Sequence, residues 1–287
     1  MNDNSNAGKM RVAVSGGGPA GMAVAIGFAQ QGHDVVVLEY LESPAIRGTV
    51  NRDRSYPLDV TARGMKALGD IGCVDQGGAV RRCTLPFYDH GDHTNPGLLG
   101  TRDDIVLGLL GHIQASQSQW PGSITIHFNV SVVGVDLAQR TVSTDPSVTN
   151  DPFDLICACD GKASVVRDSA AQQFPGLVVT PREDEIMLYK TFNLDRCESA
   201  DNDIPSGWLI HEGPCLFARM PSGGALGLCP VWDPTDATPL RSYVPPRFMS
   251  YITPEEEAAF LTRPVNRPSV GFVASRLTAG CVVLIGD

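Results

Sequence analysis

The feature that most constrains this fold is a cluster of glycines between two short apolar runs near the start of the chain. The hexapeptide at 16–21 (GGGPAG) has the spacing GxGxxG and directly follows the β-rich run 11–15. Residues 19–31 have the small and apolar side chains of a buried helix, and 34–39 (DVVVLE) read as a strand buried on both faces. Strand, glycine turn, helix and strand in this order predict a βαβ unit with a right-handed crossover.

Each glycine of the hexapeptide has a task in a dinucleotide-binding turn. Gly16 makes the tight turn, Gly18 lets the backbone approach a pyrophosphate, and Gly21 lets helix and strand pack closely. The helix opens with Pro19 and Ala20, so its free N–H groups and the positive end of its dipole would face the phosphates. These residues predict a dinucleotide site at the start of the first helix.

An acidic residue closes the second strand of the unit. Glu39 lies 23 residues after Gly16, where the dinucleotide fingerprint has an acidic residue. Its carboxylate would accept hydrogen bonds from the ribose hydroxyls, and its charge would repel a 2′-phosphate. The alternative is a glycine-rich turn without a ligand, with Glu39 only solvated.

Three later segments extend the pattern with a helix start and two strand ends. They are Arg102 at the start of the expected helix 102–119, Asp160 and Gly161 after the expected strand 153–159, and Gly286 and Asp287 after the expected strand 281–285. With these segments the chain resembles the single-component FAD-dependent aromatic hydroxylases, the group A flavoprotein monooxygenases. That family carries GxGxxG, a DG motif of the form DGxxSxxR, and a late GD motif, in this order.

The resemblance implies a cofactor and its contacts. It implies FAD, with NADPH or NADH as a transient co-substrate. It places Arg102 and the DG segment, Asp160 and Gly161, against FAD, and gives the DG segment a second role towards the nicotinamide cofactor. Asp287 of the GD motif would hold a ribityl hydroxyl, for which an ionised carboxylate is suited because it accepts two hydrogen bonds.

The resemblance also implies an activity. The family hydroxylates small aromatic substrates with dioxygen, and segments 51–68 and 126–129 look most like kynurenine 3-monooxygenases. We expect no catalytic side chain, because the cofactor carries the chemistry. Two alternatives stay open: another FAD oxidoreductase of the same fold, such as a polyprenyl reductase or epoxidase, and a non-catalytic nucleotide-binding fragment. Arg81, Arg82 and Tyr88 read as surface residues of a loop.

The expected fold class is α/β, a Rossmann-like FAD-binding domain with an inserted antiparallel-sheet (α+β) substrate domain. We expect a disordered leader at 1–10, the first part of the FAD-binding domain at 11–180, the substrate domain at 181–275 and a return strand at 276–287. Further expected elements are helices at 59–72 and 254–261 and a pair of strands at 124–128 and 131–135. Because relatives in the family continue past the GD motif, we expect an incomplete chain that holds the ADP half of FAD better than its reactive half.

Composition excludes several other classes. The net charge of −10, without a basic cluster, is unsuited to sequence-independent nucleic-acid binding. No apolar stretch approaches the roughly 20 residues that cross a bilayer.

The eight cysteines include no CxxC pair, and the first ten residues are too polar for a signal peptide, so we expect reduced thiols and a cytoplasmic location. Residues 89–93 (DHGDH) have metal-binding residue types but lie in a polar loop, so we expect no metal.

Overall fold

The computed structural model describes residues 8–47, 56–75, 77–88, 96–182, 188–198, 203–233, 235–266 and 271–286. The chain forms two compact units, each made of separate stretches. The first unit contains Met1–Ile46, Leu109–Asp184 and Val270–Asp287, and the second contains Arg47–Gly108 and Glu185–Ser269. Residues 47–108, expected in the first domain, therefore group with the second unit.

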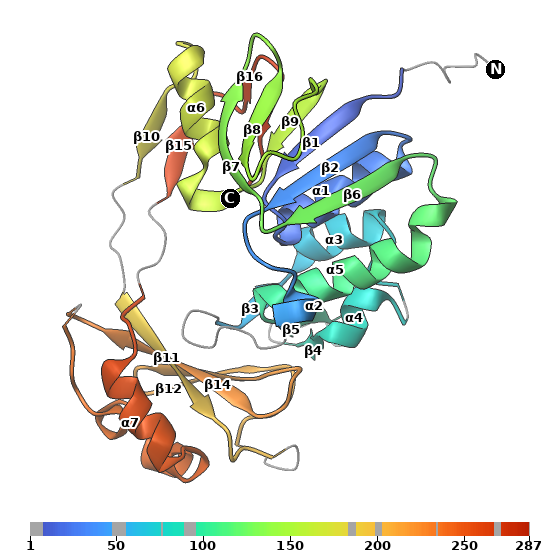
Figure 1. Ribbon diagram of the computed structural model, residues 1–287. Helices are drawn as coiled ribbons and strands as arrows, with labels where there is room; N and C mark the ends of the chain where they lie inside the picture. Colours follow the sequence, from blue (N-terminus) through green and yellow to red (C-terminus); the bar gives the residue numbers. More distant parts are fainter. Residues whose placement is uncertain are drawn as a thin grey trace. The chain divides into compact units, whose positions relative to one another are not determined.

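The first unit is built on a six-stranded sheet in the order β16-β17-β9-β1-β2-β6 (Figure 1). The parallel strands are β1 (Arg11–Ser15), β2 (Asp34–Glu39), β6 (Ser123–Phe128), β9 (Leu155–Ala158) and β17 (Val282–Leu284), and β16 (Thr278–Ala279) adds an antiparallel edge. The order reverses at β1, because β2 lies on one side of it and β9 on the other. This arrangement confirms the predicted α/β fold with a parallel sheet.

Burial explains why the central strands have so few polar side chains. Val12, Ala13 and Val14 of β1 are completely buried, since β1 has a strand on either side and α1 (Pro19–Gln30) packs on it. The small residues of α1 allow that close packing; its buried positions include Ala25 and Ala29.

The rest of the first unit differs from the expected pattern in one pairing. The expected strands 124–128 and 131–135 exist but do not pair with each other: β6 pairs with β2, and β7 (Ser131–Asp136) pairs with β8 (Thr141–Asp145). The helix α6 (Val165–Gln173) packs on β7, and β10 (Val179–Pro181) pairs with β15 (Phe272–Ala274). Strand pairing depends on residues distant in sequence, so alternation alone did not reveal it.

The second unit contains the predicted antiparallel sheet and its helix. The strands β11 (Leu188–Leu194), β12 (Leu209–Glu212), β13 (Cys215–Arg219) and β14 (Ala225–Val231) lie in the order β11-β14-β13-β12. The helix α7 (Pro254–Thr262) packs against β11. The aromatic side chains of Phe192, Phe217, Phe248 and Phe260 are fully buried in the core that joins them.

A second, smaller sheet explains why residues 47–108 belong to this unit. The strands β3 (Leu58–Val60), β4 (Leu85–Phe87) and β5 (Gly97–Gly100) are antiparallel, in the order β3-β5-β4. Phe87 and Leu99 form a core cluster with Ala218 of β13, so the small sheet packs on the four-stranded one. The helices α3 (Ala62–Asp70) and α4 (Ala79–Cys83) lie between these strands in sequence, and the expected helix 59–72 is divided into β3 and α3. The helices α2 (Pro44–Arg47) and α5 (Arg102–Ser116) cross the boundaries between the two units.

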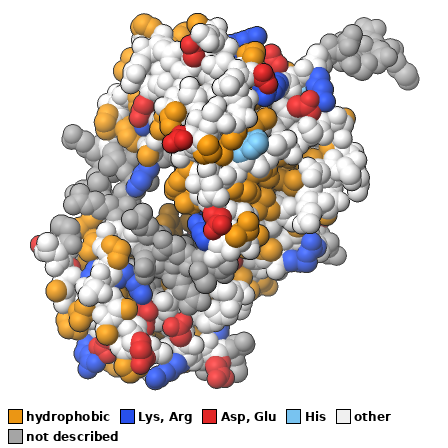
Figure 2. Space-filling model, in the orientation of Figure 1, with side chains coloured by type: hydrophobic (Ala, Val, Ile, Leu, Met, Phe, Trp, Pro, Cys, Tyr) orange, Lys and Arg blue, Asp and Glu red, His pale blue; other side chains and the backbone are white. Residues whose placement is uncertain are grey.

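The surface of the second unit carries paired charges. Figure 2 shows acidic and basic side chains interspersed on its visible face. Arg241 forms an ion pair with Glu257, and Arg247 forms one with Glu212. In the described part of the chain, no helix combines the length and the apolar character that crossing a membrane requires.

Candidate functional site

The fold of the first unit brings three sequence motifs to one edge of the parallel sheet. Gly16 follows β1, Asp160 and Gly161 follow β9, and Gly286 follows β17. The strand ends are joined by hydrogen bonds: the Cys159 N–H donates to the Ser15 carbonyl at 2.8 Å, and the Ile285 N–H to the Ala158 carbonyl at 3.0 Å. The carboxyl ends of adjacent parallel strands, where the strand order reverses, are where open α/β sheets bind ligands.

The glycine turn has the tight geometry that its sequence predicts. Gly16 has φ +97°, and an added Cβ there would collide with the Cys159 carbonyl and lie 2.9 Å from the Asp160 Cα. An added Cβ on Gly21 would collide with the Gly16 carbonyl oxygen. The first and third glycines of the motif are therefore required by the fold itself.

The middle glycine is different. Gly18 precedes α1 as its N-cap residue with φ −74°, which any residue can adopt, and no side chain caps this helix end. Pro19 occupies the first turn, where its missing N–H costs nothing. The N–H groups of that first turn are thus left without a side-chain cap and can bind a ligand. Gly18 is buried, but its backbone conformation does not require a glycine.

Glu39 turns its carboxylate towards the glycine turn. It is 5% exposed at the end of β2, and its Oε2 accepts a hydrogen bond from the Gly17 N–H at 2.6 Å. Its Oε1 accepts one from the Leu41 N–H at 2.9 Å. A carboxylate has about four acceptor positions, and these two bonds are the ones that residues of the described part of the chain donate to it. Sequence reasoning missed that Glu39 also holds the turn in place.

Asp160 offers an unpaired acceptor at the same edge. Its Oδ2 accepts from the Val166 N–H at 3.3 Å, whereas its Oδ1 is buried and has no hydrogen-bond partner in the described part of the chain. A buried acceptor without a partner is costly, so a hydroxyl or amide donor of a ligand fits this position. Space is present as well: an added Cβ on Gly161 or Gly286 would meet nothing within 4 Å.

The SxxR part of the DG motif has a structural role in this unit. Ser164 caps α6 by accepting from the Arg167 N–H at 3.0 Å. The Arg167 side chain donates to Asp168 and to the Lys162 carbonyl and lies 4.0 Å over the Phe272 ring. These contacts attach α6 to β15.

The roles expected of two further residues, Arg102 and Asp287, stay predictions. Arg102 is exposed at the start of α5, in the second unit, so its contact with FAD stays a prediction. Thr101 caps the helix that Arg102 begins: the Asp104 N–H donates to Thr101 Oγ1 at 3.1 Å, and Thr101 Oγ1 donates to Asp104 Oδ2 at 2.7 Å. Asp287 lies outside the described residues.

The cysteines near the site have no reactive character. Burial raises the pKa of Cys157, at the end of β9, and of Cys159 to about 12. Both thiols therefore stay protonated at neutral pH, which removes the nucleophilic form. The loop at 89–93 lies outside the described residues, and in the part of the chain that is described no three His, Cys, Asp or Glu side chains gather as a metal site would require.

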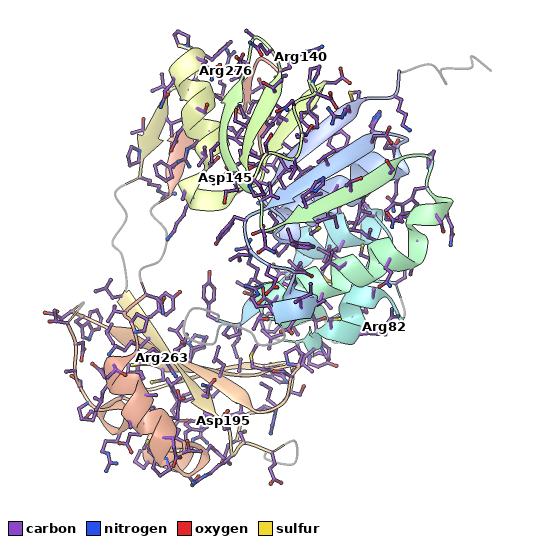
Figure 3. All side chains as sticks on the ribbon, in the orientation of Figure 1. Arg82, Arg140, Asp145, Asp195, Arg263 and Arg276 are labelled. Atoms are coloured by element: carbon purple, nitrogen blue, oxygen red, sulfur yellow. The ribbon has the colours of Figure 1, made fainter. Side chains whose placement is uncertain are left out.

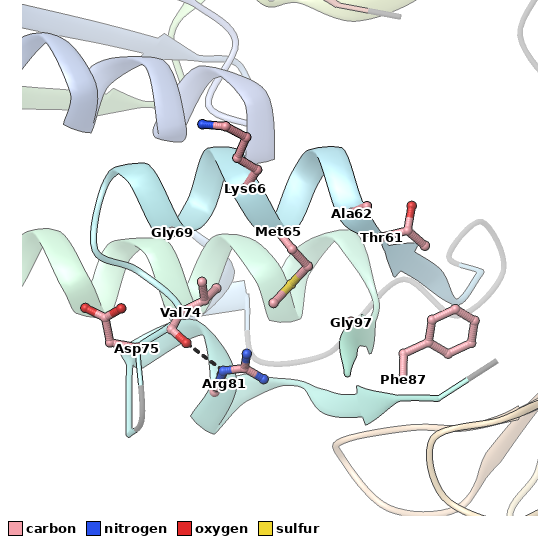
Figure 4. Close-up of a pocket in the computed structure, with 10 residues that line it drawn as sticks. All are labelled: Thr61, Ala62, Met65, Lys66, Gly69, Val74, Asp75, Arg81, Phe87 and Gly97. Carbon is pink, nitrogen blue, oxygen red and sulfur yellow. Dashed lines mark hydrogen bonds between the residues drawn. The ribbon is translucent and has the colours of Figure 1, made fainter. Parts of the chain in front are cut away.

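The second unit has a cavity of about 480 Å³ beside α3 (Figure 4). Its walls include the apolar side chains of Met65, Val74 and Phe87 and the charged side chains of Asp75 and Arg81. Arg81, like its neighbour Arg82, belongs to α4 rather than to a loop, which corrects the expectation from sequence. Its Nε donates to the Val74 carbonyl at 2.6 Å, so the guanidinium is held at the cavity (Figure 4). Sequence reasoning missed this cavity, because it forms only when the elements between residues 61 and 97 pack together.

Comparison with known proteins agrees with this geometry. Residues 14–76 match the model of an NAD(P)-binding Rossmann-like domain. Kynurenine 3-monooxygenase of Salinispora tropica is 30% identical over 179 residues, which is 56% of this chain and 38% of that protein. The corresponding protein of Anopheles gambiae is 28% identical over 195 residues, 62% of this chain and 37% of that protein. The chain thus spans well under half the length of the curated relatives it matches.

Solved structures show the same fold over nearly the whole chain. The tetrameric form of 2-methyl-3-hydroxypyridine-5-carboxylic acid oxygenase superposes with a TM-score of 0.66 at 21% identity, covering 98% of this chain and 75% of that one. p-Nitrophenol 4-monooxygenase of Pseudomonas putida superposes with a TM-score of 0.63 at 17% identity, covering 97% of this chain and 72% of that one. The resemblance predicted from the motifs is confirmed: the curated relatives of this chain are kynurenine 3-monooxygenases, and its fold is that of the FAD-dependent aromatic monooxygenases.

Proposed function

We propose that this chain binds FAD at the carboxyl edge of its parallel sheet, as part of a monooxygenase. The monooxygenase uses NADPH or NADH and dioxygen to hydroxylate a small aromatic substrate. The observation that carries the proposal is the meeting of three motifs at the joined ends of β1, β9 and β17. One such turn is common in nucleotide-binding proteins, whereas the three together match one family.

The residues at this edge divide the binding of FAD among them. The amides at the start of α1, beside Gly18, would receive the pyrophosphate, and the helix dipole would favour its negative charge. Glu39 would accept the hydroxyls of the adenosine ribose with its remaining lone pairs. Asp160 would use its unpaired Oδ1 for a donor group of the cofactor. When bound, FAD supplies the redox chemistry with dioxygen, and the side chains bind and orient it.

The cavity of the second unit supports the substrate class. A guanidinium held at its Nε leaves its η nitrogens for a carboxylate, and Asp75 offers a charge for an ammonium group. The Met65 and Phe87 side chains provide an apolar wall for a ring. An aromatic amino acid of the kynurenine type has these three features. The mixed lining fits a small polar substrate better than the long apolar chain of a polyprenyl reductase.

The proposal is tested first by FAD binding. We expect this chain to take up FAD in a one-to-one ratio, and Gly18→Val to weaken the affinity at least tenfold, about 1.4 kcal/mol, because the added side chain blocks the pyrophosphate. The negative φ of Gly18 tolerates valine, so the circular dichroism spectrum stays unchanged. Gly8→Val, at an exposed glycine with open space around its Cβ position, is the matched control. Equal affinity in a folded Gly18→Val variant would contradict the assignment and favour a fragment without this site.

The substrate assignment has its own test. Arg81→Met should weaken binding of kynurenine to the FAD-loaded chain, with FAD affinity unchanged. Arg82→Met, at the exposed neighbouring position, should leave both affinities unchanged (Figure 3). Unchanged kynurenine affinity in Arg81→Met would remove the substrate proposal and leave the FAD proposal standing.

The cytoplasm is the compartment we propose. All eight cysteines are unpaired, and five of them are buried. Unpaired thiols in this number are typical of reducing compartments.

A further inference from the structure

Three ionisable side chains stand in one row across the sheet of the second unit. Strands β13 and β14 pair with Leu216 opposite Leu228, which places the preceding residue Cys215 opposite Cys229. Strands β11 and β14 pair with Lys190 opposite Cys229. Because residues directly opposite in an antiparallel pair project on the same face, the two thiols and the amine are neighbours.

This row faces the core. Cys215, Cys229 and Lys190 are each at most 2% exposed, and both cysteines belong to the core cluster around Phe192 and Phe217. The Cys215 thiol donates to the Tyr243 carbonyl at 3.5 Å, and the Cys229 thiol to the Pro230 carbonyl at 3.3 Å. The two side chains lie close enough for Cys215 to raise the pKa of the Cys229 thiol. None of these groups takes part in the proposed FAD or substrate sites.

The backbone geometry suits a covalent bond between the two sulfurs. Opposite residues of an antiparallel pair have Cα atoms about 4.5 or 5.5 Å apart, depending on the hydrogen-bonding position. Both values lie inside the range of about 4.4–6.8 Å found in disulfides. The register of the two strands therefore already gives the Cα separation that a disulfide needs, so the strands do not have to move apart or together.

We propose that Cys215 and Cys229 are an oxidation site, at which hydrogen peroxide converts the paired thiols of the folded chain into a disulfide. The O–O bond of the peroxide breaks and the S–S bond forms. The two thiols lose two protons and two electrons, and the peroxide becomes two water molecules. The product closes a loop of the β13–β14 hairpin and removes the two thiol hydrogen bonds to carbonyls.

The surroundings determine how readily the site reacts. The neighbouring Cys215 side chain and the burial of the thiol raise the pKa of Cys229, and the charge of Lys190 opposes that shift. Lys190 itself is held by the carbonyls of Asp236 and Phe260 at 2.9 and 3.2 Å. The oxidation is therefore slow compared with that of an exposed thiolate. The closeness of the two cysteines, and not a low thiol pKa, selects this pair.

The test uses the folded chain, hydrogen peroxide and thiol counting after denaturation. The reduced chain has eight alkylatable cysteines. We expect peroxide to remove two of them, and non-reducing peptide mapping to find Cys215 and Cys229 joined, with the loss of two hydrogen atoms. Dithiothreitol should restore all eight. Oxidation of the urea-unfolded chain should give mixed pairings instead, because the register no longer selects the partner.

Matched variants separate this pair from the others. Cys215→Ala should retain its seven thiols after the same treatment. The double variant Cys157→Ala, Cys159→Ala removes two neighbouring cysteines of the first unit and should still lose two thiols. The proposal is overturned if the wild-type chain keeps eight thiols, if another pair is joined, or if the cysteines pass to sulfinic acid without a bridge. The peptide map of the wild-type chain decides the question even where a variant does not fold.

Discussion

The helices α1 and α7 are attached to their sheets in opposite ways. In the first unit, α1 has no side-chain cap, and it approaches β1 closely because Gly21 has no Cβ. In the second unit, α7 is attached by buried polar side chains. Glu256 and Arg263, each with a side chain 7% exposed, form an ion pair near its two ends. Figure 3 labels Arg263 at the end of α7.

The contacts of α7 continue into the neighbouring strand. Glu256 accepts from the backbone N–H of Asn193 at 2.8 Å and from its side-chain amide at 3.1 Å, and Arg263 donates to the Thr191 carbonyl at 2.7 Å. Lys190 donates to carbonyls in the last turn of the helix. The difference has a functional meaning: the helix that would receive a phosphate keeps its first amides open, whereas α7 has its polar groups paired within the protein.

The largest expected effect concerns the buried ion pair. Glu256→Gln leaves the Arg263 guanidinium without its counter-charge in the core, which should lower the free energy of unfolding by about 3–5 kcal/mol. Glu257→Gln, on the same helix, breaks only the pair with the exposed Arg241 and should cost at most about 1 kcal/mol. Urea unfolding followed by circular dichroism measures both. Equal effects would mean that the polar network does not attach α7.

The next effect concerns close approach at α1. Gly21→Ala places a Cβ against the Gly16 carbonyl and should cost about 1–3 kcal/mol or more, because backbone atoms have to move. Gly69→Ala, in α3, meets only ordinary contact with Val74 at 3.8 Å and should be neutral or stabilising by up to about 1 kcal/mol. A thermal melt distinguishes them. A stabilising Gly21→Ala would show that α1 does not depend on this contact.

A pH effect is expected from the buried thiols of the first unit. The pKa of Cys157 and of Cys159 is raised to about 12 from 9.0, so the folded chain holds protons that the unfolded chain releases. Their contribution to stability is full below pH 9 and is lost as the pH rises towards 12. The slope is at most about 1.4 kcal/mol per pH unit for each thiol.

Replacing Cys157 with alanine separates the contribution of this thiol from that of other groups that titrate in the same pH range. Urea unfolding of Cys157→Ala at several values between pH 9 and pH 11 should show a smaller slope than the wild-type chain. Identical slopes would contradict the assigned burial of the thiol.

The smallest effect concerns the helix caps. Thr253 accepts from the Glu256 N–H at 3.1 Å, and Ser164 accepts from the Arg167 N–H at 3.0 Å. Thr253→Ala and Ser164→Ala should each lower the free energy of unfolding by about 1 kcal/mol. FAD affinity should not change in Thr253→Ala. A change there would show that the polar contacts of α7 and the FAD site are coupled.

Local patterns predicted much of the first unit correctly. The strands at 11–15 and 34–39 and the helix after Gly18 were found, because short apolar runs and glycine turns act over a few residues. The antiparallel strands of the second unit and the helix near 254 were also found from alternation and turn residues. The β7–β8 hairpin, α6 and the small sheet around β5 were not, since short polar strands carry a weak pattern.

The order of residues along the chain determined the βαβ unit and the presence of the three motifs, because the conformation of a glycine turn and the period of a strand are local properties. Only the tertiary structure decided which strands are neighbours. Strand order brings Asp160 beside Gly16, and strand register brings Cys215 beside Cys229. The packing of neighbouring elements holds Arg81 at a cavity, and the packing of α7 on β11 buries Glu256 with Arg263. These contacts form because whole sheets and helices bury apolar surface against each other. The free energy of that burial is gained only when the chain folds, so no short stretch of sequence reveals it.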